Sequence, residues 1–152
     1  MTIIEHVYRE RDLPDGARRF GRDTVTLGWE ERTRAHALRT TDNGVEFGTS
    51  LPRGTVLRAG DLLVLDDERL VVAVAERLEP VLLVEPRSAS EWALFAYHIG
   101  NCHQPLMLTD EAIVCADLPG MEETLDYHRI PFTRRIQPFT PVADGVAHTH
   151  QP

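Results

Sequence analysis

The sequence predicts an α+β protein in which an N-terminal all-β domain precedes a ferredoxin-like βαββαβ domain and a short flexible C-terminal tail. Residues 1–76 contain short β-rich runs separated by turn residues, with no helix-period stretch of useful length. Residues 77–141 combine strand patterns with two apolar helical stripes, in the order strand, helix, strand, strand, helix, strand. Residues 142–152 contain little that could pack against a core, which is typical of a mobile tail.

A hairpin signal organises the N-terminal domain. Residues 34–38 alternate with a period of two, as a half-buried strand does. Asn43 and Gly44 separate this run from an expected return strand at 45–47, because both residues tolerate the positive φ of a tight turn. The other strands expected in this domain are residues 24–27, 62–65 and 70–75.

The C-terminal domain is expected to open with a buried strand and a helix. Residues 81–84 form a continuous apolar run, as a central strand does. Ser88 and Glu91 fit a capping box, which satisfies the free amides at a helix start. Gly100 can end this helix. Its predicted apolar stripe consists of Trp92, Phe95, Ala96 and Ile99.

A second helix and three further strands complete the predicted domain. The apolar stripe of the second helix consists of Leu118, Met121, Leu125 and His128. Pro131 is expected to stop this helix. The strands are residues 106–108, 112–116 and 132–139. Right-handed crossovers would place both helices on one face of a four-stranded sheet.

Composition argues against several classes of function. The chain has 152 residues, with 16 Lys and Arg against 24 Asp and Glu, a net charge of −8. This acidic balance argues against nucleic-acid binding and against docking on anionic lipid. The longest apolar runs have strand length, so we expect no membrane span. Charged residues interrupt the N-terminus where a signal peptide would be apolar, so we expect a cytoplasmic protein with its two cysteines reduced.

Common catalytic motifs are absent from the sequence. It contains no GxSxG, GxxxxGK[ST], HExxH or CxxC. Cys102 and His103 could supply a thiol nucleophile and its base, but adjacent residues seldom meet in the required geometry. We therefore predict no catalytic residues and no enzymatic activity. Two alternatives stay open, a small zinc-dependent hydrolase that uses His103 and Cys102, and a protein-interaction module with incidental metal affinity.

Three of the seven histidines are candidate metal ligands. His103 closely follows the predicted first helix, where Gly100 would let the backbone turn and leave the imidazole free to point outward. His148 and His150 form a His-x-His pair near the chain end, which can chelate nickel, copper or zinc. Imidazole ligands must be neutral, so acid is expected to release the metal.

One fixed histidine is too few ligands for a stable transition-metal site. Two copies related by a two-fold axis would bring two His103 imidazoles together, and the tails could add one or two more ligands. Such an exposed site suits a carrier that must release its metal better than a catalyst. The sequence leaves open whether Cys102 or His98 joins the site.

Four segments of the chain resemble the urease accessory protein E family of nickel metallochaperones. Residues 51–61 are similar to the family segment LPRGxxLxxGD, and residues 97–103 contain its GNxH metal motif. Residues 138–141 resemble the closing PFxP, and residues 148–150 resemble the histidine-bearing tail. The match covers nearly the whole chain.

The resemblance implies a homodimer that carries Ni(II) as cargo for urease assembly and catalyses no reaction. His103 of both subunits would meet nickel at the interface, with His148 and His150 as auxiliary ligands; Zn(II) or Cu(II) could occupy the same site. The N-terminal domain would contact protein partners. The implied partners are the family's GTPase, urease accessory protein G, and through it the apo-urease complex. Two departures are Cys102, where the family often has arginine, and a tail with only two histidines.

Overall fold

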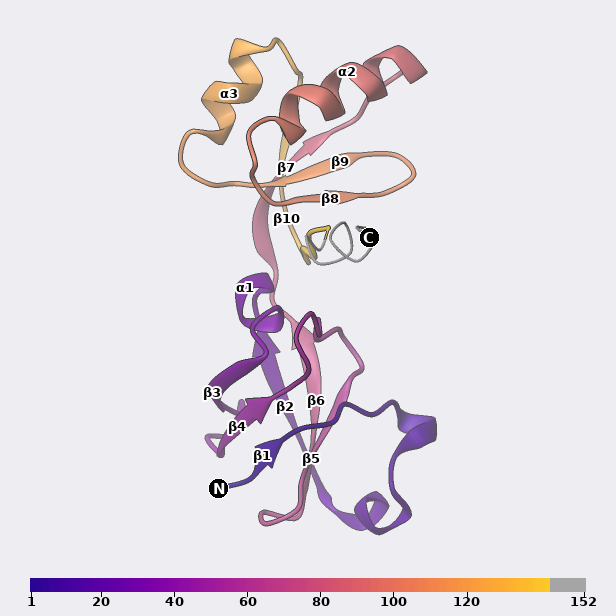
Figure 1. The fold of residues 1–152 in the computed structure, drawn as a ribbon, viewed down its shortest axis with the longest axis vertical. Helices are drawn as coiled ribbons and strands as arrows, with labels where there is room; N and C mark the ends of the chain where they lie inside the picture. Colours follow the sequence, from indigo (N-terminus) through magenta and orange to yellow (C-terminus); the bar gives the residue numbers. More distant parts are fainter. Residues whose placement is uncertain (143–152) are drawn as a thin grey trace, which may run out of the picture. The chain divides into compact units, whose positions relative to one another are not determined.

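The computed structural model describes residues 1–142, so the predicted tail ligands His148 and His150 lie outside the described residues. The chain divides into two compact units, of which the first is Met1–Arg77 and the second begins at Leu78. Figure 1 shows the elements of the two units in sequence colours. Within residues 1–142, no helix combines the length and the apolar character that a membrane span needs.

The first unit contains two three-stranded sheets, which confirms the prediction of a β domain. One sheet has the order β1-β4-β3, with β1 at Ile3–Ile4, β4 at Glu46–Ser50 and β3 at His36–Thr40. The other has the order β2-β6-β5, with β2 at Gly21–Leu27, β6 at Leu70–Glu76 and β5 at Leu62–Leu65. Three short helical segments interrupt the strands: Glu10–Asp12, Asp15–Arg19 and the single turn α1 at Trp29–Arg32.

The predicted hairpin is present between β3 and β4. The two strands pair antiparallel, and Gly44 has φ +96° in the turn that joins them. The strand begins at His36, two residues later than predicted, and continues to Thr40. Arg39 therefore lies on the inner face, where its guanidinium donates to the carbonyls of Glu31 and Arg34 at 2.8 and 2.7 Å. A pattern of apolar residues cannot predict that a charged side chain occupies a position facing the core.

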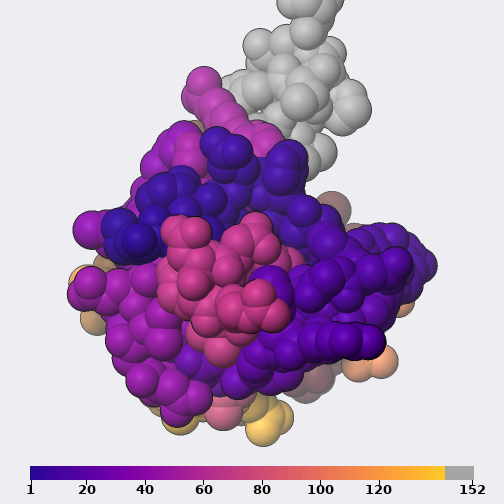
Figure 2. All heavy atoms as spheres, turned by 90° about the horizontal axis from the view of Figure 1, so that it is seen from below, coloured from indigo at the N-terminus to yellow at the C-terminus, as the bar shows by residue number. Residues whose placement is uncertain are grey.

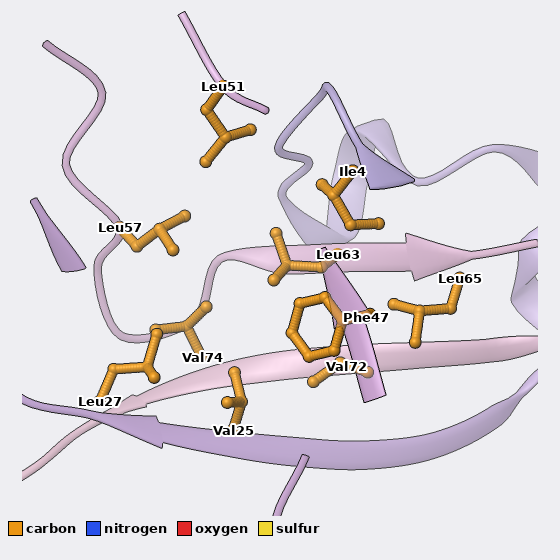
Figure 3. Close-up of a cluster of buried hydrophobic side chains, with 10 residues drawn as sticks. All are labelled: Ile4, Val25, Leu27, Phe47, Leu51, Leu57, Leu63, Leu65, Val72 and Val74. Carbon is orange, nitrogen blue, oxygen red and sulfur yellow. The ribbon is translucent and has the colours of Figure 1, made fainter. Parts of the chain in front are cut away.

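The core of the first unit lies between its two sheets. In Figure 3, Phe47 of β4 points toward Leu63 and Val72, which belong to the other sheet. All three side chains are fully buried. The buried cluster consists of Ile4, Val25, Leu27, Phe47, Leu51, Leu57, Leu63, Leu65, Val72 and Val74.

The N-terminal strand is attached to the turn between β5 and β6. The backbone amide and hydroxyl of Thr2 donate to the Glu68 carboxylate at 3.1 and 2.8 Å. Figure 2 shows the indigo N-terminal residues beside the pink residues of this turn. These bonds hold a two-residue strand that has little backbone pairing of its own.

The second unit has the predicted ferredoxin-like order. Its elements are β7 (Glu79–Val84), α2 (Ala89–Gly100), β8 (Leu106–Leu108), β9 (Ile113–Ala116), α3 (Met121–Tyr127) and β10 (Thr133–Gln137). The sheet order is β10-β7-β9-β8, and every neighbouring pair is antiparallel. The last strand ends at Gln137, two residues before the predicted end. The α+β fold class is confirmed.

One face of this sheet packs against the two helices. Leu82 of β7 lies opposite Cys115 of β9, and both belong to a buried cluster that includes Phe95 and Ile99 of α2. Ala96, predicted on the same stripe, is exposed, so that prediction was wrong. Successive residues of a helix are rotated by about 100° around its axis. Ala96 lies outside the narrow face of α2 that packs against the sheet.

The second predicted helix ends before the proline expected to stop it. α3 ends at Tyr127, and the amide of Ile130 donates to the Leu125 carbonyl at 2.9 Å. Arg129 has φ +56°, so this is a Schellman-type end built on a residue other than glycine. The helix is terminated by its own backbone bonds, and Pro131 lies outside it.

Candidate metal centre

α2 is the element that positions His103, and its start is capped as predicted. The Glu91 amide donates to the Ser88 hydroxyl at 3.1 Å. The Glu91 carboxylate in turn accepts from the amide of Arg87 at 2.9 Å, one residue before the expected partner. The cap satisfies amides that would otherwise be free at the helix start.

His103 stands two residues beyond the C-cap of α2. The amides of Cys102 and His103 donate to the carbonyls of Ile99 and Gly100 at 3.1 and 3.2 Å, so the helix tightens into a short 3-10 turn. His103 itself has φ +54° and is exposed. Only glycine adopts this left-handed conformation at no steric cost, so the backbone at His103 stores about 1–2 kcal/mol of strain.

The backbone turn is therefore at His103 and not at Gly100. Gly100 is the last residue of α2 and is absent from the residues with positive φ. A Cβ added at Gly100 would meet nothing within 4 Å. The sequence interpretation, in which this glycine provides the turn, was wrong, and nothing within the described chain requires glycine at this position.

The two cysteines have different surroundings. The Cys102 thiol is half-buried and donates to the His98 carbonyl one turn back along α2, at 3.3 Å. Cys115 is 1% exposed, and burial, with a smaller contribution from Cys102, raises the pKa of its thiol to about 12. The structure therefore directs the Cys102 sulfur back toward the helix.

We expect one reactive thiol per native chain. At pH 8, a pKa of about 12 leaves roughly one Cys115 thiol in 10,000 as the reactive thiolate. A thiol-specific chromogenic reagent should therefore label Cys102 alone in the native protein and both cysteines in denaturant. Cys102→Ser should lose all native labelling. Rapid labelling of Cys115 in the native Cys102→Ser variant would contradict the described burial.

A pair of stacked histidines joins the ends of the two helices. The rings of His98 on α2 and His128 at the end of α3 have centroids 4.0 Å apart and planes 19° apart. Tyr97 contacts His98 edge-on with ring centroids 5.4 Å apart, and Tyr127 contacts His128 edge-on with ring centroids 5.0 Å apart. Ligand nitrogens bind metals in the ring plane, so two nearly parallel rings cannot both direct a nitrogen at one ion. No sequence signal predicted that these two histidines contact each other. Only the position of His128 on an apolar stripe indicated a packing role.

No complete ligand set exists within one described chain. Among residues 1–142, no group of three or more His, Cys, Asp or Glu side chains is arranged to hold a metal ion. His103 is placed on the surface, whereas the other two predicted ligands, His148 and His150, lie outside the described residues. Among residues 1–142 of one chain, the candidate centre is therefore one exposed imidazole on a left-handed turn.

Family models match both units of the chain. The UreE urease accessory protein N-terminal domain matches residues 4–76, and the C-terminal domain of the same family matches residues 79–152. The chain belongs to the UreE family. The resemblance predicted from the four motifs is confirmed. UreE proteins are accessory proteins and not enzymes, which confirms the prediction that the chain has no enzymatic role.

Individual UreE proteins align over most of this chain. The urease accessory protein UreE of Burkholderia thailandensis is 38% identical over 129 residues, covering 84% of this chain and 60% of its own length. That of Paraburkholderia xenovorans is 38% identical over 116 residues, covering 72% and 51%. That of Burkholderia mallei is 37% identical over 128 residues, covering 83% and 63%. The chain thus spans less than two thirds of the length of these curated relatives.

The UreE-like segment at 51–61 has a structural role in the first unit. Leu51 and Leu57 are buried in its core, and Gly54 and Gly60 have φ of +87° and +88°. Asp61 forms an ion pair with Arg9, in which Arg9 Nε lies 3.1 Å from Asp61 Oδ1. The segment therefore stabilises the β domain through turns and burial, and we assign it no ligand.

Proposed function

We propose that this UreE protein is a cytoplasmic nickel metallochaperone that binds Ni(II) between two copies of the chain and delivers it for assembly of the urease active site. The observation that carries the proposal is His103, an exposed imidazole on a left-handed turn that belongs to no group of three or more potential ligands within residues 1–142. The left-handed turn after α2 leaves this imidazole on the surface. A two-fold axis beside His103 would provide two imidazoles at once.

The outer face of α2 is the surface we assign to the second copy. Leu94 is 53% exposed and Tyr97 is 64% exposed, and Ala96 and Gly100 lie nearby along the same helix. This apolar face leads to His103 at the end of α2. The open space at Gly100 leaves room for the backbone of a second chain to approach closely.

Coordination would be completed by ligands beyond the two His103 side chains. We propose that His148 and His150 supply them, since imidazole is a ligand that nickel accepts readily. Zn(II) and Cu(II) compete for such sites, and copper binds more strongly by the usual order. The proposed partners are urease accessory protein G, a GTPase, and the apo-urease complex, with the first unit as a contact surface.

The two alternatives are less well supported. A zinc hydrolase that uses His103 and Cys102 needs the thiol beside the metal, whereas the Cys102 thiol donates back to the His98 carbonyl. It also needs further fixed ligands, and residues 1–142 contain no such group. A protein-interaction module with incidental metal affinity would keep all its partner binding in the presence of a chelator.

We expect one tightly bound Ni(II) per two chains. The measurement is calorimetric titration of Ni(II) into metal-free protein, combined with light scattering to determine the mass of the species that binds. A dimer with a stoichiometry of one ion per two chains supports a site on the two-fold axis. One ion per chain in a monomer would contradict the proposal, because His103 would then need all its co-ligands from its own chain.

A further inference from the structure

The end of α2 that carries His103 is held in two different ways. Phe95 and Ile99 bury one face of the helix in the core of the second unit, where Ile99 is 1% exposed. Apolar burial is not directional, so it resists sideways displacement of a helix end only weakly. The second contact is the stack of His98 on His128, whose ring centroids lie 4.0 Å apart. Figure 1 shows α3 beside this end of α2, so the stack is a lateral contact between the two helices.

His128 is the fixed side of this contact. It is the C-cap of α3, where its amide donates to the Thr124 carbonyl at 3.2 Å. The Ile130 amide donates to the Leu125 carbonyl at 2.9 Å, and both of these side chains are buried, with Leu125 0% and Ile130 2% exposed. The backbone on either side of His128 is thus anchored in the core. A ring on so well anchored a helix end can restrain the half-buried side chain of His98.

The segment that leads to His103 starts at His98. The Cys102 thiol donates to the His98 carbonyl at 3.3 Å, while the Cys102 amide donates to the Ile99 carbonyl at 3.1 Å. The His103 amide then donates to the Gly100 carbonyl at 3.2 Å. These bonds join residues 98–103 in one short, tightly wound segment. A displacement of His98 is therefore transmitted to the His103 imidazole.

We propose that His128 is a positioning residue of the candidate metal centre and acts on His103 through the ring of His98. The inference rests on the proposed function, in which two His103 imidazoles meet at one ion and each must be held in place. The two stacked planes lie 19° apart, so both rings cannot direct a nitrogen at the same ion. Stacked aromatic pairs shift a conformational equilibrium about 2- to 12-fold. Loss of the stack would lower the fraction of α2 ends that can bind metal by a factor in that range.

The test is the Ni(II) affinity of variants of the whole chain, measured by competition titration with a chelator of known affinity. We expect His128→Ala to weaken binding at least about fourfold, because a site between two chains loses about twofold or more from each. His128→Phe keeps a ring but has no nitrogen ligand, and it should restore the affinity to within about twofold of the wild type. His98→Ala combined with His128→Ala should lose no more than the weaker-binding single variant. His36→Ala, which removes an exposed imidazole from the first unit, should change nothing.

NMR of the metal-free protein measures the stack independently of nickel. The ring protons of His98 should show an upfield ring-current shift in the wild type and in His128→Phe, and they should lose it in His128→Ala. His128→Leu, which keeps a side chain of similar size but no ring, should also lose the shift and bind nickel as His128→Ala does. Trp92 fluorescence in a Trp29→Phe background verifies that the second unit of each variant is folded.

Three results would overturn the positioning role of His128. The first is wild-type nickel affinity in His128→Leu despite loss of the ring-current shift. The second is a His128→Phe variant that keeps the shift but not the affinity, because His128 would then act as a ligand. The third is a wild-type protein without the shift. Wild-type nickel binding that is indifferent to His103 would instead overturn the proposed function itself.

Discussion

Replacing His103 with alanine is expected to lower Ni(II) affinity by at least about 100-fold, or about 2.8 kcal/mol. The effect is large because one substitution removes two ligands from a site on a two-fold axis. The remaining ligands would be the tail histidines, which have no fixed His103 imidazole to complete the chelate. Calorimetric titration with competition by a chelator measures the affinity, and light scattering determines whether the variant retains the dimer.

His36→Ala is the matched control for this substitution. His36 is also exposed, but it lies on β3 in the first unit, remote in sequence from every proposed ligand. His36→Ala also removes an exposed imidazole, so any change in nickel affinity from losing a nonspecific imidazole would be equal in both variants. We expect His36→Ala to bind nickel as the wild type does. Full affinity in His103→Ala would exclude His103 from the site and remove the main support for the proposed function.

Replacing Arg32 with alanine is expected to destabilise the first unit by about 3–5 kcal/mol. Arg32 is the largest fully buried side chain among residues 1–142. Its guanidinium donates to the carbonyls of Leu27 and Leu57 at 3.2 and 3.3 Å and lies 3.9 Å from the Glu76 carboxylate. Alanine would leave a cavity, two carbonyl acceptors without these donors and a carboxylate without this cation.

Urea unfolding measures this loss within the first unit. The chain has two tryptophans, Trp29 in the first unit and Trp92 in the second, so a Trp92→Phe background reports fluorescence from Trp29 alone. Arg34→Ala, which removes an exposed arginine side chain two residues away, should change the free energy of unfolding by less than about 0.5 kcal/mol. A change below about 1 kcal/mol for Arg32→Ala would show that water replaces the guanidinium at little cost.

Local patterns predicted most elements of the fold. The Asn43-Gly44 turn, the buried runs of β5 and β7, and the capped start of α2 all appear where the sequence indicates them. Each of these signals depends on a few neighbouring residues: a turn that needs positive φ, a strand buried on both faces, or amides that need a cap. Physical causes that act over such short stretches can be identified from the sequence alone.

Features that depend on tertiary packing or on the geometry of a helix end were not predicted correctly from the sequence. Ala96 has the spacing of a core residue, yet the face of α2 that meets the sheet excludes it. No sequence signal indicated that the guanidinium of Arg39, a residue type that is usually exposed, would donate to backbone carbonyls inside the first unit. Gly100 has the usual chemistry of a backbone turn, yet the left-handed residue is His103. In each case a neighbour distant in sequence, or the end geometry of the helix, decided the outcome.

The sequence by itself determined the α+β class, the strand and helix order of the second unit, the membership of the UreE family and the choice of His103 as a candidate ligand. Periodicity, caps and short motifs carry that information because they are properties of contiguous residues. Only the tertiary structure decided which way the Cys102 thiol points, that His98 stacks on His128, and that the amide of Val142 donates to Leu106 of β8. The last two contacts join segments far apart in the chain and depend on how the helices and sheet pack together, whereas the first depends on the geometry in which α2 ends.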